Sequence, residues 1–369
     1  MIWWSLPGPS AFINAIADDV REGKSVFLQL PSHCPGRLSL SLKQTLGDDF
    51  TWLSSTVNED STPINFLYGL LVPESDAAQL RNARSLVSQD SFQGYIIWLE
   101  GLSVENWPSW SEFFAEYEGV SRAVPPARRT HFLVPLTDRA SLLEPPEAIG
   151  ISKRTWDGWI KPSDMRFYSY LRVEERRSTL ETELTFALVA ELAGWDPELC
   201  EWLAPFPLEQ LTQPLDQLIE FAGQRKWNAR SVDTTHRGWS NGYCHTIGGS
   251  TTLHTSILAL LSQSSEIDRL VWRAEVGVLM PYIEEQRQDL LKRYQRSLWV
   301  PFTTKNNELI ENIFDLEIGH MEYQLSASSD VKREEVNWVS VLKRARNCLS
   351  HLEPVTSNLL KFIVERPQR

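Results

Sequence analysis

The pattern of apolar residues changes near residue 150, and this change constrains the fold more than any other feature of the sequence. Before that point, short apolar runs typical of buried strands alternate with amphipathic stretches typical of helices. The predicted strands occupy 25–30, 94–99 and 131–136, and the predicted helices occupy 10–22 and about 110–118. Strands separated by helices are typical of a parallel sheet. We therefore expect an α/β domain with a parallel sheet over residues 1–150.

Beyond residue 150 the sequence predicts helices almost without strands. Residues 151–260 form a predicted all-α middle region, with helices over 178–195 and 199–224 and a polar loop over 226–250. Residues 261–369 then show four apolar-periodic stretches, at about 266–297, 307–326, 335–352 and 356–365. Four such helices with short connections are typical of an up-down four-helix bundle. Pro281 falls inside the first helix, so we expect a kink or break near Met280.

Composition and charge exclude several classes of protein. The 42% hydrophobic and 23% charged residues are ordinary for a globular chain, and no apolar run is long enough to span a membrane. The N-terminal residues do not resemble a signal peptide, so we expect a cytoplasmic protein. The four cysteines are scattered, which favours neither a disulfide framework nor a zinc ribbon. With a net charge of -12, nucleic-acid contact must be local or supplied by a partner. Some of the 15 tryptophans could anchor a protein interface.

The segment after the first predicted strand stands at the position of a phosphate-binding loop. It retains the second glycine of the GxxxxGK[ST] pattern as Gly36. The other key positions are changed, because Pro31 replaces the first glycine, Arg37 replaces the lysine and Leu38 replaces the hydroxyl residue that binds Mg²⁺. A simple loop containing proline and glycine is the alternative interpretation.

The end of the second predicted strand is altered in a similar way. Leu99 stands where an acidic residue supports Mg²⁺ in P-loop ATPases, and Glu100 follows it. This layout resembles the AAA+/STAND branch of P-loop ATPases over about residues 10–225. The resemblance implies a degenerate, non-hydrolysing domain that uses no cofactor, with Gly36, Arg37 and Glu100 as the remnant of the site. An unrelated α/β domain and a working ATPase are the alternatives.

A short polar motif closes the third helix of the predicted bundle. Arg346 is followed directly by Asn347 and, after four intervening residues, by His351. The motif and its place resemble the HEPN superfamily, whose RNases carry an arginine, commonly an asparagine after it, and a nearby histidine. The resemblance covers about residues 265–369. It implies RNA as substrate and a homodimer in which two bundles pair and two motifs line one cleft.

The residue types suit metal-independent RNA cleavage, for which no metal site is expected. Histidine titrates near neutral pH, so His351 could act as general acid or base on the ribose 2′-hydroxyl. Arg346 could stabilise the developing phosphorane charge, and Asn347 could orient the imidazole or a phosphate oxygen. From residue 331 to 369 the sequence holds eight basic and four acidic residues, and this local positive charge favours binding of an RNA phosphate backbone. The alternative is structural: His351 caps the helix, and Arg346 pairs with Glu317 or Glu353.

Two further features carry less weight. Glu317 and His320 lie three residues apart in the second predicted helix and are secondary candidates, with a packed polar pair as the alternative. Cys244, His245 and His254 lack a fourth neighbour for zinc. The resulting prediction is an endoribonuclease of the HEPN type, an effector in bacterial antiviral defence or a toxin system. The alternative is a non-catalytic scaffold subunit of a larger defence complex that binds partner proteins.

Overall fold

The computed structural model describes residues 2–58, 61–73, 81–125, 128–176, 178–233, 236–304 and 306–366. The chain forms two compact units, each built from two segments. The first unit comprises Met1–Asp164 with Arg230–His254, and the second comprises Met165–Ala229 with Thr255–Arg369. Residues of the expected middle region, 151–260, are therefore divided between the two units. No helix in the described part of the chain combines the length and apolar character needed to cross a membrane.

The first unit contains a five-stranded parallel sheet, which confirms the predicted α/β architecture. The strand order is β2-β3-β4-β1-β5. The bounds are β1 Ser25–Gln29, β2 Thr51–Thr56, β3 Tyr95–Glu100, β4 His131–Leu136 and β5 Ile151–Thr155. The three predicted strands are the central ones. The two edge strands, β2 and β5, were not expected, because they are half exposed and lack an apolar run.

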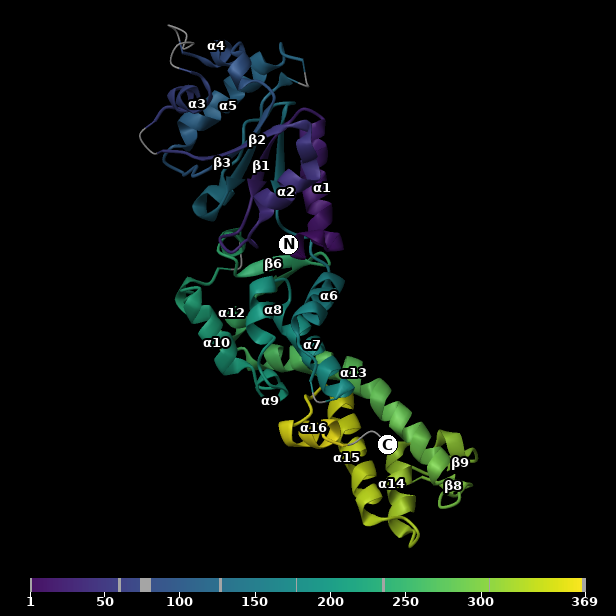
Figure 1. Ribbon diagram of the computed structural model, residues 1–369. Coiled ribbons are helices and arrows are strands. Elements are labelled where there is room, and N and C mark those ends of the chain that lie inside the picture. Colours follow the sequence, from purple (N-terminus) through teal and green to yellow (C-terminus); the bar gives the residue numbers. More distant parts are fainter. Residues whose placement is uncertain are drawn as a thin grey trace. The chain divides into compact units, whose positions relative to one another are not determined.

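Helices cover both faces of this sheet. Their bounds are α1 Pro7–Arg21, α2 Leu38–Leu46, α3 Pro63–Leu71, α4 Ala83–Val87 and α5 Trp107–Ser121. Helix α1 contacts α2 and β1, whereas α3 and α4 contact α5 on the other side of the sheet (Figure 1). This division follows from right-handed crossovers, because the β1–β2 connection runs across the sheet in the opposite direction to the connections that follow it. Both predicted helices of this unit are confirmed.

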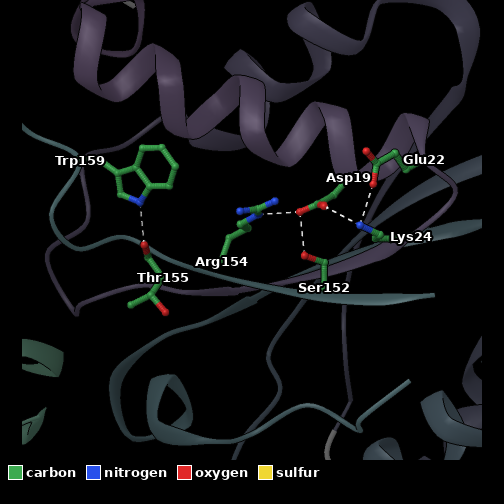
Figure 2. A network of polar contacts seen from close by, with 7 residues as sticks. All are labelled: Asp19, Glu22, Lys24, Ser152, Arg154, Thr155 and Trp159. Carbon is green, nitrogen blue, oxygen red and sulfur yellow. Dashed lines mark hydrogen bonds and ion pairs between the residues drawn. The ribbon is translucent and has the colours of Figure 1, made fainter. Parts of the chain in front are cut away.

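A buried carboxylate joins α1 to the edge strand β5 (Figure 2). The Asp19 side chain accepts hydrogen bonds from Ser152 at 2.7 Å, from Arg154 at 2.6 Å and from Lys24 at 3.2 Å. Burial alone would raise the pKa of Asp19, but these three donors hold it below its ordinary value. Because a paired, hydrogen-bonded carboxylate is costly to disrupt, this network fixes the last strand of the sheet to the first helix.

The polar stretch predicted as a loop over 226–250 is folded, so that prediction was wrong in part. It contains α11 (His236–Ser240) and a hairpin of β6 (Cys244–Ile247) and β7 (Ser250–Leu253). Gly248 and Gly249, both at positive φ, form the two-residue turn that such a hairpin requires. The hairpin is held in the first unit by Asp157, which accepts hydrogen bonds from the Thr246 amide and hydroxyl at 2.7 and 2.8 Å.

The second unit is mainly helical. Its helices are α6 Pro162–Arg172, which begins at the end of the first unit, then α7 Thr179–Ala193, α8 Pro197–Leu203, α9 Leu208–Leu211, α10 Leu215–Gln224, α12 Thr255–Leu260, α13 Ser264–Arg293, α14 Ile318–Ala327, α15 Arg333–Ser350 and α16 Ser357–Val364. Helix α13 packs against α7 and α15, and α15 also contacts α14 and α16. The predicted helices over 178–195, 199–224, 335–352 and 356–365 are present. The four-helix bundle itself stays a prediction.

Two helix predictions in this unit differ from the structure in detail. Helix α13 continues through Pro281, so the break that was one of the two expected outcomes near Met280 is absent. The packing of α13 on α7 and α15 offsets the roughly 3 kcal/mol that an internal proline costs. The helix expected over 307–326 begins only at Ile318. Before it, β9 (Leu309–Ile310) pairs with β8 (Phe302–Thr303), and the Asn312 side chain accepts the Phe314 N–H to start a 3-10 turn. This local bond competes with the helix.

Candidate functional site

Arg346 lies on α15 beside the buried stripe of that helix. The stripe has helical spacing and consists of Trp338, Val339, Leu342, Ala345 and Leu349. The Arg346 side chain is 36% exposed, and its Nη2 lies 3.3 Å from Oε2 of Glu317, which is 57% exposed. Two sequence-predicted candidates are thus brought together as an ion pair between α15 and the start of α14. This is the structural alternative that the sequence left open for Arg346.

Glu317 and His320 are joined by a capping box at the start of α14. The Glu317 N–H donates to Nδ1 of His320 at 3.1 Å, and the Glu317 carboxylate accepts from the backbone of His320 in return. An imidazole that accepts at Nδ1 carries its proton at Nε2. The ring of His320 also packs on Phe302, with centroids 5.4 Å apart. Both secondary candidates therefore have a structural role here.

A second arginine shares the charge environment of Arg346. Nε of Arg287 donates to Glu284 at 2.8 Å, and Nη1 of Arg287 donates to the Leu316 carbonyl at 2.9 Å. The hydrogen bonds from Arg287, with a smaller contribution from the positive charge of Arg346, lower the pKa of Glu284. The positive charges of Arg287 and Arg346 are therefore balanced by the negative charges of Glu284 and Glu317. This balance limits the attraction of one chain for a phosphate.

Asn347 and His351 are exposed at the end of α15. His351 is the first residue beyond the helix, and its N–H donates to the Asn347 carbonyl at 3.1 Å. Neither side chain makes a hydrogen bond or ion pair to any described residue. Asn347 and His351 are four positions apart and share a helix face, whereas Arg346 lies roughly 140° around the axis from His351 at 3.6 residues per turn. Within one chain, Arg346 is grouped with Glu317 rather than with His351.

The turn that follows His351 is anchored at both ends to α13. Nε1 of Trp272 donates to the Leu349 carbonyl at 2.8 Å, and the Val355 N–H donates to Oε2 of Glu275 at 2.7 Å. Glu275 is fully buried, and burial raises its pKa to about 8. Between the two anchors Leu352 adopts a left-handed conformation, with φ at 63°, which normally favours glycine at a helix end.

Sequence reasoning missed Trp272 and Glu275. One signal could have found the second of these. Val271, Glu275 and Leu279 follow one another at four-residue spacing on the apolar stripe of α13, so a carboxylate interrupts a buried face.

Comparison of the chain with protein-family models, curated proteins and solved structures found no match.

The loop after β1 is hydrogen-bonded to the surrounding protein through both donor and acceptor groups. The Ser32 N–H donates to the Ser240 carbonyl at 2.8 Å, and Nε1 of Trp4 donates to the Gly36 carbonyl at 2.8 Å. Arg37 is exposed and left-handed, with φ at 69°, immediately before α2. At the end of β3, the Glu100 side chain accepts a hydrogen bond from Nε1 of Trp98 at 2.6 Å. A phosphate cradle requires free backbone N–H groups, and here the Ser32 donor is already used.

Cys244 and His245 lie on β6, and His254 directly follows β7. Cys244 is buried, which raises the pKa of its thiol to about 11, and burial lowers the pKa of the His245 imidazole although Asp157 lies 3.4 Å away. Among the described residues, no group of three or more His, Cys, Asp or Glu side chains is arranged to hold a metal ion.

Proposed function

We propose that the chain is a metal-independent endoribonuclease whose reacting groups lie at the end of α15. The observation that carries the proposal is the exposure of Asn347 and His351 on one helix face, without side-chain partners in the described residues. A histidine held by structural contacts would be paired. An exposed imidazole on an anchored turn can instead accept the proton of a ribose 2′-hydroxyl.

A homodimer follows from the positions of Arg346 and His351 on α15. The two side chains point in different directions around the helix, so one copy cannot place both on the same phosphate without rearrangement. Two copies paired through the second unit would let His351 of one act with Arg346 of the other. His351 would activate the 2′-hydroxyl, Arg346 would stabilise the phosphorane charge, and Asn347 would orient a phosphate oxygen.

RNA cleavage in the presence of EDTA tests this proposal. The full chain is incubated with total RNA and with tRNA, beside His351→Ala and Arg346→Ala. Arg344→Ala is the matched control, because Arg344 is exposed on the same helix and forms no ion pair in the described part of the chain. Loss of cleavage in both test variants, with the control fully active, would support the site. Equal activity in all four proteins would reject it.

The proposal includes a degenerate P-loop-like fold for the first unit, and the order of its strands supports this. The chain leaves β1 toward β2 but leaves β4 toward β5, so the carboxyl ends of β1 and β4 form the switch point where open α/β sheets bind ligands. The remnants Gly36 and Arg37 lie in the loop after β1, and Glu100 is the last residue of β3, the neighbour of β4. We expect neither hydrolysis nor a cofactor there. No rise in melting temperature with ATP and Mg²⁺ is the expected result, and a rise would show binding.

A non-catalytic scaffold is the second candidate, and the Arg346–Glu317 ion pair favours it. In that case the polar groups of α14 and α15 hold the second unit together and its surfaces bind partner proteins. The setting in cytoplasmic antiviral defence or a toxin system rests on the resemblance alone. A chain that cleaves no RNA, while His351→Ala and Arg346→Ala keep its oligomeric state, would shift the conclusion to the scaffold.

A further inference from the structure

A groove in the second unit is separate from the end of α15. It has two lobes of about 1070 and 720 Å³, and both lobes are lined by Glu175, Arg176, Glu181, Val364 and Glu365. The walls come from the end of α6, the start of α7, α9 and α16. The lobes therefore form one continuous depression, on the scale of sites that accept a ligand or a short segment of chain.

The walls of the groove are fixed by hydrogen bonds. The Ser178 hydroxyl donates to the Val364 carbonyl at 3.4 Å, and the Thr212 and Ser357 hydroxyls lie 3.2 Å apart. Nη2 of Arg176 donates to the Ala204 carbonyl at 2.7 Å. Because these contacts tie α16 to α7 and α9, the depression is formed before any partner arrives, which reduces the entropic cost of binding.

One end of the groove is apolar and exposed. Tyr170 is 63% exposed and Leu171 is 41% exposed, both at the end of α6. The ring of Tyr170 meets Phe186 of α7 edge to face, with centroids 5.8 Å apart. Apolar side chains that remain exposed beside a depression indicate an interaction surface.

The remaining lining is predominantly acidic. Among the lining residues that the structure describes, five are glutamates: Glu175, Glu181, Glu183, Glu209 and Glu365. None of them forms an ion pair with a described residue. Of the three cations among the described lining residues, Arg366 is bound to Glu335 at 3.0 Å and lies 4.1 Å over the Trp338 ring. Among the described lining residues, the positive charges of Arg176 and Lys361 therefore stand against the negative charges of five carboxylates. This excess of negative charge attracts a positively charged ligand.

We propose that this groove binds a basic amphipathic helix of a partner protein. Lysine or arginine side chains of that helix would meet the glutamates, and its apolar stripe would pack on Tyr170, Leu171 and Phe186. RNA does not fit, because its phosphates would face the five carboxylates. The inference does not depend on the proposed ribonuclease activity.

A defined peptide pair tests the proposal. The probe is a fluorescent helical peptide of leucine and lysine with one apolar face, and its counterpart has glutamate in place of lysine. Binding to the full chain is followed by fluorescence anisotropy. We expect the lysine peptide to bind, with an affinity that falls with salt, and the glutamate peptide not to bind.

Matched variants locate the binding site. The variant E175Q/E183Q/E365Q removes three exposed carboxylates of the groove, and we expect it to weaken binding by about tenfold. The control E112Q/E116Q/E147Q removes three exposed, unpaired carboxylates elsewhere in the described chain and should bind like the unchanged protein. The Tyr170→Ser variant should also weaken binding.

Four results would overturn the proposal. The first is the absence of binding, and the second is an equal loss in the groove and control variants, which would indicate attraction to net charge alone. The third is binding only to a chain that ends at Arg366, which would assign the groove to the last residues of this chain. An RNA oligonucleotide that competes with the peptide at the groove would overturn it as well.

Discussion

Arg346 and Glu317 form an ion pair between α15 and the start of α14, with Nη2 and Oε2 3.3 Å apart. The same glutamate shares a capping box with His320. A residue proposed to act on RNA is therefore held, in the isolated chain, by a residue that also organises a helix end. The pair has one of two roles: it holds Arg346 until RNA binds, or it only stabilises the contact between α14 and α15. A measurement of RNA cleavage and of stability in one variant distinguishes the two.

Glu317→Gln separates these two roles. Both partners are substantially exposed, so the pair contributes about 0–1 kcal/mol, and we expect a small change in the free energy of unfolding. If Arg346 acts on RNA, its release should preserve or increase cleavage. Urea unfolding and RNA cleavage are measured on the same samples, with Glu322→Gln on α14 as control, since Glu322 pairs with Lys343 instead. Cleavage lost in Glu317→Gln but not in the control would contradict the idea that Glu317 only holds Arg346 until RNA binds.

Asp19→Asn tests the network that joins α1 to β5. The side chain is buried and bonded to Ser152, Arg154 and Lys24, so the substitution should cost about 2–4 kcal/mol at pH 7. Because the folded pKa of Asp19 is lowered, its contribution is fully present above the unfolded pKa of 3.8 and disappears as the pH falls through the folded value. The difference between variant and unchanged protein should therefore shrink in acid.

The neighbouring Asp18 supplies the control for this experiment. Its side chain is 68% exposed and, among the described residues, pairs only with Arg21 three positions away, so Asp18→Asn should change the free energy of unfolding by less than about 0.5 kcal/mol. Thermal or urea unfolding at pH 7 and near pH 3.5 provides the data. Equal costs for the two substitutions would argue against a structural role for the network.

Leu352→Gly should stabilise the protein. Leu352 is 67% exposed and has φ at 63°, so its side chain adds little packing while its Cβ is strained. We expect a gain of about 0.5–1 kcal/mol, observed as a higher midpoint of urea unfolding. Leu352→Ala retains the Cβ and should show no such gain. A loss of stability with glycine would mean that the leucine side chain makes contacts that outweigh the strain.

The sequence predicted those parts of the fold in which local pattern and burial agree. Strands β1, β3 and β4 are apolar and central, and α15 carries a clear stripe. Edge strand β5 has the sequence Ile-Ser-Lys-Arg-Thr and forms through pairing with β1, a long-range contact that no local pattern shows. The glycine pair of the β6–β7 hairpin was visible but was interpreted as part of a loop.

In the candidate site, too, local spacing was predictable from the sequence and tertiary contacts were not. The spacing of Arg346, Asn347 and His351 predicts the motif, and the helix that carries the first two and ends at the third was expected. The ion pair of Arg346 was foreseen only as an alternative, because the choice between Glu317 and Glu353 depends on where α14 begins. Trp272 and Glu275 act through tertiary contacts with the turn after His351, which lies many residues away in the sequence. Such contacts require the packing of α13 on α15.

Glu275→Gln tests how the turn after His351 is held, through the pH dependence of stability. The folded pKa of Glu275 is raised to about 8, whereas the unfolded value is 4.5. Between these values the unfolded chain releases a proton that the folded chain retains, so this group lowers the free energy of unfolding as the pH rises. Glutamine does not titrate, and its carbonyl can still accept the Val355 N–H.

The variant should therefore gain stability over the unchanged protein as the pH rises from 5 to 8, by an amount on the order of a few kcal/mol. Urea unfolding at several pH values measures the difference in free energy of unfolding between the two proteins. The contributions of titrating groups that both proteins share cancel in this difference. Glu275→Leu is the control, since it also removes the charge but leaves the Val355 N–H without an acceptor, and it should be less stable than glutamine throughout. A difference between Glu275→Gln and the unchanged protein that stays constant with pH would mean that Glu275 is ionised in the folded chain. The anchor of the turn would then be a buried carboxylate rather than a neutral acid.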